Sequence, residues 1–291
     1  MKTILCATDY SLNSVAALKY AHNISSQLNN RLVITHVFDD QTVFDSKLLS
    51  DVFPSSEKDA LKTHRKKLEE FCDGYLGAVW KAPNIQLQPV ENRSIVKGIL
   101  STAEEWHAQM VVVGIKGESP HKEIIMGRTA QNLIEKAPCP ILAVPADASL
   151  VTLKTMVYAT DLEEEDVYAI RKLTKLAKAF DAKIKVVHIV TEDEYEGETQ
   201  MEWFQEMLKE KVTYGKMNFK LFFSDDIFES LRIYLSDVNA DLVVMLEREH
   251  KGILKKWFHR DLVKKMESYG RVPLLSFREG NHQLFYFSAV L

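Results

Sequence analysis

The sequence predicts an α/β protein that consists of two tandem, doubly wound domains. Short apolar runs rich in β-branched residues alternate with segments of helical periodicity, as in βαβ units with parallel strands. The chain also repeats itself. Residues 3–9 and 155–161 both end in Ala-Thr-Asp, and the apolar runs 33–37 and 185–189 each carry a histidine at the same distance from that aspartate. Two matches in one register indicate a duplication.

The repeat continues to the end of each copy and sets the expected domain boundaries. Residues 108–113 recur as 240–245, and residues 139–144 recur as 271–277. The expected divisions are a first domain at residues 1–147, a degenerate second domain at 148–281 and an apolar tail at 282–291.

The first copy begins with an apolar strand before Asp9, followed by a helix that Ser11 or Asn13 caps. Apolar residues within 15–24 give this helix a buried stripe. A second helix starts behind Pro54. Most strands are apolar on both faces, as a sheet between two helix layers requires. The remaining elements expected in this copy are strands at 33–37, 85–90, 110–113 and 141–144, and helices at 55–76, 95–106 and 129–136.

The second copy shows the same alternation of strands and helices. Its first strand again lies just before an aspartate, Asp161. The further elements expected here are strands at 185–189, 242–245 and 274–277, and helices at 164–180, 198–211, 227–238 and 255–268.

Composition narrows the classes of partner. The chain has 291 residues, is 46% hydrophobic and carries a net charge of −4, so it can bury a sizeable core. The acidic balance gives no reason to expect nucleic acid or an anionic membrane as a partner. No apolar run reaches the length of a spanning helix. Three cysteines without a C-x-x-C pair fit a reducing compartment, so we expect a cytoplasmic protein.

Three glycines mark the most informative segment. Gly114, Gly117 and Gly127 follow the apolar run 110–113 with the spacing G-x2-G-x9-G, and a helix is expected directly after them. A strand that leads into a glycine-bearing loop and then a helix presents backbone N–H groups to an anion. The alternative is that the glycines serve turn geometry and close backbone approach only. The spacing favours the anion site.

Asp9 lies just past the first strand and Gly114 just past the fourth, so both are expected to border one crevice at the carboxyl ends of the strands. Asp9 could accept hydrogen bonds from a ribose or an adenine amino group. It could equally cap the helix that begins near Ser11. Asp161 keeps the same place in a copy without the glycine loop, which favours the cap.

Signals for catalysis or metal binding are weak. The chain has neither G-x-x-x-x-G-K-[ST] nor G-x-G-x-x-G, so a phosphate-loop or Rossmann dinucleotide site is unsupported. His36 and His188 lie inside apolar strands and are assigned to the core. His250 and His259 lack a metal-ligand spacing. We therefore assign no catalytic residue and no metal site.

The chain resembles a tandem universal stress protein, and two such domains would cover nearly all of it. The resemblance rests on Ala7 to Ser11, on His36-Val37, on the segment 111–127 with its glycines, and on residues 138–144. It implies a five-stranded parallel sheet with helices on both faces in each domain, the adenine nucleotide alpha hydrolase-like fold. It also implies that the final strands, 141–144 and 274–277, pair the two domains as family dimers pair.

In the ATP-binding branch of that family, the matching positions hold an adenine nucleotide, with Mg²⁺ as an accompanying ion. Asp9 and Val37 would flank the adenosine, and the glycine loop would meet ribose and phosphates. The nucleotide-binding residues that the resemblance implies are Ala7, Thr8, Asp9, Val37, Val113, Gly114, Lys116, Gly117, Gly127, Arg128 and Thr129.

Two departures from the family pattern shape the functional hypotheses. Arg128 follows the last glycine where the family has Ser or Thr, and it could clamp a phosphate or obstruct the loop. In the second copy, Met245 and Arg248 are expected where the first two glycines would fall, so that copy is predicted not to bind nucleotide.

Two hypotheses follow. The first is a cytoplasmic stress-response protein whose first domain alone binds ATP or a related nucleotide, with slow hydrolysis at most. The second is a nucleotide-free scaffold or chaperone-like pseudodimer that acts through protein partners. A homodimer of the whole chain is compatible with both.

Overall fold

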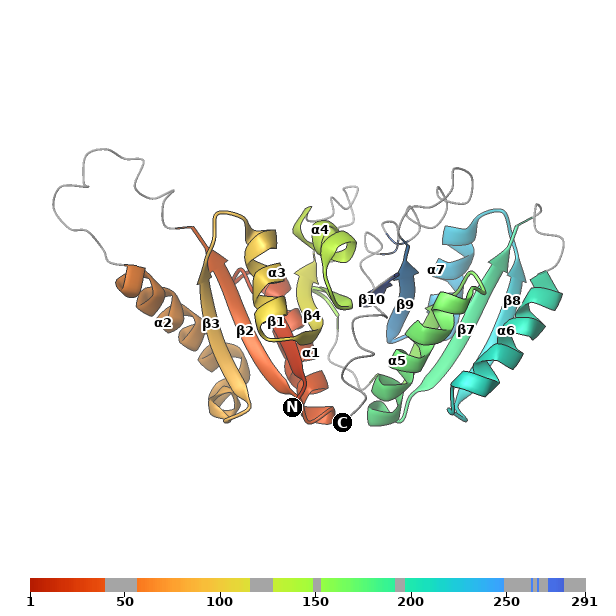
Figure 1. The fold of residues 1–291 in the computed structure, drawn as a ribbon, viewed down its shortest axis with the longest axis horizontal. Helices are drawn as coiled ribbons and strands as arrows, with labels where there is room; N and C mark the ends of the chain where they lie inside the picture. Colours follow the sequence, from red (N-terminus) through yellow and green to blue (C-terminus); the bar gives the residue numbers. More distant parts are fainter. Residues whose placement is uncertain are drawn as a thin grey trace.

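The computed structural model describes residues 1–39, 57–115, 128–148, 153–191, 197–248, 263, 266 and 272–279. Strands and helices alternate throughout these residues, as the hydrophobic periodicity predicts. Figure 1 shows an elongated molecule with α2 and β3 at one end and α6 and β8 at the other.

The elements of the N-terminal half are β1 (Thr3–Ala7), α1 (Leu12–Gln27), β2 (Arg31–Phe38), α2 (Glu57–Leu76), the 3-10 helix η2 (Gly77–Lys81), β3 (Ile85–Glu91), α3 (Ile95–Glu105), β4 (Ala108–Ile115), α4 (Arg128–Lys136) and β5 (Ile141–Pro145). The elements of the C-terminal half are β6 (Thr155–Ala159), α5 (Glu164–Phe180), β7 (Lys183–Val190), α6 (Gly197–Lys211), β8 (Met217–Phe223), α7 (Ile227–Asp237), β9 (Leu242–Glu247) and β10 (Leu274–Arg278).

The ten strands in the described part of the chain form one sheet in the order β3-β2-β1-β4-β5-β10-β9-β6-β7-β8. Within each half the neighbouring strands run parallel. In the N-terminal half the strand order reverses between β1 and β4, because β2 and β3 lie to one side of β1 whereas β5 lies beyond β4. The corresponding reversal in the C-terminal half lies between β6 and β9. This is the doubly wound α/β fold that the sequence predicts.

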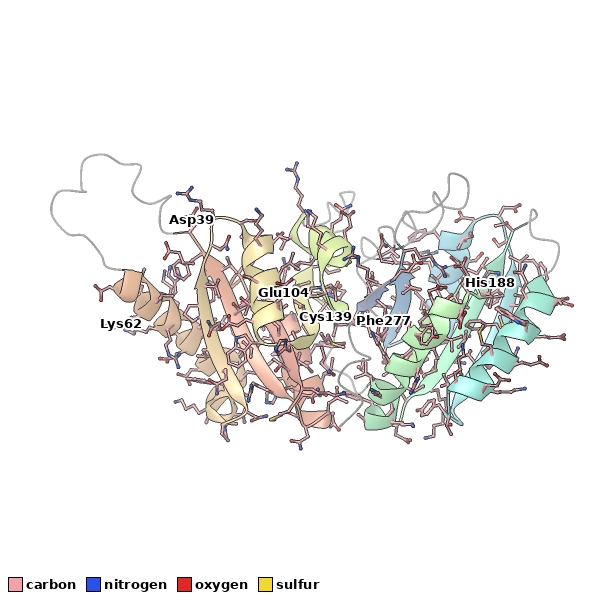
Figure 2. All side chains as sticks on the ribbon, viewed as in Figure 1. Asp39, Lys62, Glu104, Cys139, His188 and Phe277 are labelled. Atoms are coloured by element: carbon pink, nitrogen blue, oxygen red, sulfur yellow. The ribbon has the colours of Figure 1, made fainter. Side chains whose placement is uncertain are left out.

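The two halves meet at β5 and β10, which pair antiparallel with Leu142 opposite Leu275. Both side chains are buried, and they belong to one apolar cluster that spans the two halves. Figure 2 labels Phe277 on β10 near the middle of the molecule, and this side chain belongs to the same cluster. The joint therefore continues the hydrogen-bonded sheet and its apolar packing from one half into the other.

Helices cover both faces of the sheet. Buried side chains of α1, α2, α5 and α6 pack with residues from one face, and buried side chains of α3, α4 and α7 pack with residues from the other. Strands such as β1 and β5 are buried along their whole length because each lies between the two helix layers.

The observed helices agree closely with those expected from the sequence. The helix at 164–180 matches α5, and the other helices that can be compared differ by one residue at an end. Ser11, not Asn13, is the N-cap residue of α1. The sequence analysis did not predict the strand β8. Its side chains alternate between partly buried and exposed, and none of them is fully buried.

Parts of the expected elements fall outside the described residues. Of the helix expected at 255–268, the structure describes Val263 and Met266, which are helical and buried. Residues 55 and 56 of the second helix and the tail at 282–291 also lie outside.

The three cysteines are free and buried. Burial raises the pKa of the Cys72 and Cys139 thiols to about 12, and it raises the pKa of Cys6 further, so all three stay protonated. They behave as small apolar core residues.

Candidate functional site

The strand ends at the switch point between β1 and β4 bring the predicted residues of the first copy together. Ala7, the last residue of β1, lies opposite Val113 of β4 and Thr35 of β2. Thr8 and Asp9 therefore leave β1 beside Gly114, at the carboxyl edge of the sheet. In open α/β sheets this edge is where ligands bind.

The turn after β1 is held rigidly by the hydroxyl of Thr8. Thr8 Oγ1 accepts a hydrogen bond from the backbone N–H of Tyr10 at 3.0 Å and lies 2.8 Å from Oγ of Ser14 in α1. The Thr8 backbone N–H donates to the carbonyl of Thr35 at 2.9 Å. Tyr10 has the left-handed φ of 64° that lets the chain turn sharply into α1. The position of Asp9 is thus fixed by hydrogen bonds on both sides.

Asp9 is exposed and forms a tight turn with Ser11. Its Oδ1 accepts hydrogen bonds from the backbone N–H of Ser11 at 3.0 Å and from Ser11 Oγ at 2.5 Å. Burial would raise the pKa of Asp9, but the hydrogen bonds from Ser11 outweigh it and lower the pKa below its usual value. Asp9 is therefore an anionic acceptor at neutral pH. It precedes the cap residue Ser11, so it organises the entry to α1 without being the cap itself.

Gly114 lies where the backbone of α1 comes into contact with β4. A Cβ atom at this position would be 2.3 Å from the carbonyl oxygen of Asn13 and 2.8 Å from the backbone nitrogen of Ser14. Among the described glycines, the positive φ belongs to Gly77, so Gly114 is needed for close approach and not for a left-handed turn. The first glycine of the motif is therefore explained by helix packing, which was the alternative interpretation for this residue.

Val37 contributes an apolar wall near the end of β2. Its side chain is 9% exposed, and a Cβ atom added to Gly98 of α3 would lie 2.6 Å from Val37 Cγ1. The start of α3 therefore packs directly over Val37. A ligand at this edge could touch Val37 only along its small exposed margin.

The structure describes only some of the residues predicted to bind phosphates. Lys116, Gly117 and Gly127 lie outside the described residues. Arg128 and Thr129 begin α4, where Arg128 is exposed and its carbonyl accepts a hydrogen bond from Asn132 Nδ2 at 2.7 Å. The exposed guanidinium and the N-terminal N–H groups of α4 are the donors that an anion would find here.

His36 ties β2 to the turn after β1. Its Nδ1–H donates to the carbonyl of Thr8 at 2.8 Å, and its ring lies 4.3 Å from the ring of Tyr10. Burial lowers the pKa of His36, so the imidazole is neutral at pH 7. His188, labelled in Figure 2, makes the same bond to the carbonyl of Thr160 at 2.7 Å. Because both copies keep this contact, it braces the turn. His188 is buried, as expected for a core residue, whereas His36 is only partly buried.

Tyr10 is the neighbour of this edge that sequence analysis missed. Its ring packs between His36 and Phe71, at centroid distances of 4.3 and 5.5 Å. The equivalent residue of the second copy is Leu162, which has nearly the same φ of 61°. The aromatic ring is thus a feature of the first copy only, and the shared backbone turn carries no sequence signal because neither residue is a glycine.

The C-terminal half closes the corresponding position with a side chain. Strand pairing sets Met110 and Leu242 opposite equivalent residues of β1 and β6, which makes Leu246 the counterpart of Gly114. The expectation that Met245 stands there was wrong by one residue, and Arg248 corresponds to Lys116, not to Gly117. Leu246 is fully buried. A close approach like that of Gly114 is not available at this position.

Comparison with known proteins agrees with this geometry. A model of the universal stress protein family matches residues 1–145. Residues 1–145 belong to the universal stress protein family. A universal stress protein of Methanocaldococcus jannaschii is 28% identical over 149 residues, which are 49% of this chain and 81% of that protein. A putative universal stress protein of Staphylococcus aureus is 25% identical over 169 residues, which are 56% of this chain and 96% of that protein.

The fold of both halves also has a counterpart among solved structures. The crystal structure of a universal stress protein from Archaeoglobus fulgidus matches with a TM-score of 0.68, at 15% identity, over 96% of this chain and 98% of that one. At this identity the match concerns the fold alone. The universal stress protein segment of the chain ends at Pro145, the last residue of β5.

The described helices include no segment that is long and apolar enough to span a bilayer. Within the described part of the chain, no three His, Cys, Asp or Glu side chains are grouped as metal ligands.

Proposed function

We propose that this universal stress protein binds an adenine nucleotide, with ATP as the first candidate, in its N-terminal half only, and that it acts in the cytoplasm in the response to stress. The observation that carries the proposal is that Asp9 and Gly114 lie at neighbouring strand ends at one switch point of the sheet, where α4 is the next described helix after β4. Asp9 supplies an anionic acceptor and α4 supplies N–H donors. These are complementary to the hydroxyl groups and phosphates of a nucleotide.

The adenosine would lie along the ends of β1 and β2. Asp9 would accept hydrogen bonds from ribose or from the adenine amino group, beside Ala7 and Val37. The phosphates, with Mg²⁺, would extend over Gly114 toward Arg128 and Thr129. Because Arg128 is exposed at the first turn of α4, its guanidinium can approach a phosphate without first breaking a buried contact.

The C-terminal half is proposed to bind no nucleotide. Leu246 fills the place of Gly114, and three carboxylates, Asp161, Glu163 and Asp166, surround the strand ends where the N-terminal half has Asp9 alone. Arg248 supplies one positive charge among these three carboxylates, so the negative charge that remains would repel a triphosphate. The domain division at 147 and 148 thus separates a binding half from a non-binding half.

Isothermal titration of the full chain with ATP and Mg²⁺ tests the proposal. We expect one site per chain. Gly117→Trp should abolish binding by filling the loop, whereas Gly215→Trp should leave it unchanged, because no atom lies within 4 Å of a Cβ at Gly215. Absence of heat at millimolar ATP for the native chain, or equal binding by both tryptophan variants, would refute the proposed site.

A second candidate function is a nucleotide-free scaffold that acts through protein partners. The pairing of β5 with β10 favours it, because this pairing joins the two halves through one continuous sheet. Nucleotide released from the purified protein on heat denaturation would argue against this candidate. A chain purified without nucleotide that also fails to bind ATP would favour it.

A further inference from the structure

Arg248 follows β9 and places its guanidinium over the N-terminus of α5. Its Nη2 donates to Asp166 Oδ2 at 3.0 Å, its Nε lies 3.5 Å from Asp161 Oδ2, and Nη1 contacts the carboxylate of Glu163. The Arg248 side chain is 17% exposed. One guanidinium thus contacts three carboxylates at the switch point between β6 and β9.

Asp166 lies at the floor of this cluster and is fully buried. It accepts hydrogen bonds from Tyr158 OH at 2.7 Å, from Thr160 Oγ1 at 2.9 Å and from the backbone N–H of Glu163 at 3.2 Å. Burial and the nearby Asp166 keep the pKa of Tyr158 well above its usual value, so the phenol stays protonated and donates. The carboxylate is surrounded by donors, and Arg248 supplies the positive charge.

Two of the three carboxylates around Arg248 have uncharged counterparts in the N-terminal half, whereas Asp9 stands at the place of Asp161. The repeat aligns Ser11 with Glu163 and Ser14 with Asp166, and Ser14 forms a neutral pair of hydroxyls with Thr8 at 2.8 Å. The first copy therefore offers an uncharged floor where the second offers a buried carboxylate. A buried carboxylate needs a paired positive charge, so Asp166 favours a cation at this edge of the sheet in the second copy.

We propose that the switch point between β6 and β9 is a cation site that the chain fills itself, with the guanidinium of Arg248 as a tethered ligand held by Asp161, Glu163 and Asp166. The guanidinium neutralises the buried Asp166 and fastens the end of β9 to the start of α5. Where the N-terminal half is proposed to bind an anion, the second copy has an internal ion-pair clamp, and this contrast rests on the proposed function.

If the Arg248 guanidinium acts as a tethered ligand, a free guanidinium should restore the stability that Arg248→Ala loses. Arg248→Ala leaves the Asp166 carboxylate buried without its cation, which is strongly destabilising in proteins. For a chain of this size, we expect the melting temperature to fall by roughly 10 °C. Methylguanidinium chloride at about 20 mM should then restore a measurable part of the loss, because the truncated side chain leaves room for a free guanidinium against the same carboxylates.

Arg232→Ala is the matched control. Arg232 forms a forked pair with Glu229 on the surface of α7, where its side chain is 34% exposed, so its loss should lower the melting temperature by no more than about 2 °C. Methylguanidinium should not stabilise this variant or the native chain. Sodium chloride at equal concentration controls for ionic strength.

The double variant Asp166→Ser/Arg248→Ala tests whether rescue depends on the Asp166 carboxylate. Serine is the residue found at the equivalent place in the first copy, and rescue by methylguanidinium should be lost once Asp166 is gone. If Arg248→Ala alone yields no folded protein, recovery of soluble protein on refolding with and without methylguanidinium becomes the measurement. Stability of Arg248→Ala within 2 °C of the native chain, or rescue no greater than that by sodium chloride, overturns the proposal.

Discussion

At Gly114 the absence of a side chain allows the backbone of α1 to lie against β4. The nearest atom to a Cβ built there is a backbone oxygen, that of Asn13, at 2.3 Å, which cannot rotate away as a side chain could. Gly114→Ala should therefore displace the start of α1 and lower the free energy of unfolding by about 1 to 3 kcal/mol. Urea unfolding followed by circular dichroism measures the change.

Gly74→Ala provides the comparison for this prediction. Gly74 lies within α2, and no atom is found within 4 Å of its added Cβ. Alanine there should raise stability by roughly 0.5 to 1 kcal/mol through helix propensity. Equal effects of the two substitutions would contradict the close-approach explanation of Gly114.

The hydrogen bonds between Asp9 and Ser11 should make the stability of the turn depend on pH. Because the pKa of Asp9 is lowered on folding, its contribution is present above the unfolded value near 3.8 and is lost as the pH falls through the folded-state pKa. At pH 7 the free energy of unfolding of the native chain should exceed that of Asp9→Asn by at most about 1 kcal/mol. This difference should vanish in stronger acid.

Asp147→Asn, at an exposed aspartate after β5, controls for the loss of a surface charge. Unfolding free energies of the three proteins from pH 2 to 7 provide the test. A difference between the native chain and Asp9→Asn that persists unchanged at pH 2 would show that the ionised carboxylate is not what stabilises the turn.

At the scale of single residues, the sequence predicts where a residue lies in the fold better than it predicts what that residue does. Asp9 and Gly114 lie at the strand ends where the pattern puts them, because the end of an apolar run marks the end of a buried strand. Whether Asp9 caps α1 or precedes its cap depends on one turn that Tyr10 closes with a positive φ, and nothing in the side-chain pattern reports that angle. Leu246 was missed because two apolar runs can be aligned with a shift of one residue and still match. The pairing of β6 with β9 fixes the register and removes this ambiguity.

At the scale of elements, helices with a clear apolar stripe were predicted nearly to the residue, as α5 shows. The strand β8 was not, because it is an edge strand whose last residue, Phe223, is 70% exposed. An edge strand need not be apolar on both faces, so it lacks the continuous apolar run that identified β1 and β4.

The strand β5 leads to a prediction about the isolated N-terminal half. In the full chain β5 pairs with β10, and its residues are buried. A fragment of residues 1–147 would expose β5 as an apolar edge strand, which favours pairing with another copy. Light scattering coupled to size exclusion should find the fragment as a dimer at concentrations of tens of micromolar, with the full chain measured alongside. A strictly monomeric folded fragment would contradict the importance of this joint.

At the scale of the molecule, one continuous sheet carries two switch points of opposite character. The first combines Asp9 with a neutral floor at Ser14, and the second places Arg248 among three carboxylates. The net charge of −4 conceals this contrast, which arises from a few exchanges at equivalent places. The duplication was visible in the sequence, but the contrast was only partly so, since an ion pair between Arg248 and Asp166 joins residues 82 positions apart.

The most direct test of the account is a crystal structure of the full chain grown with ATP and Mg²⁺. We expect one nucleotide per chain, beside Asp9 and Gly114 at the ends of β1 and β4, while the guanidinium of Arg248 remains on Asp166. Nucleotide bound beside Leu246 at the ends of β6 and β9, or an empty edge in the N-terminal half at saturating ATP, would contradict the account.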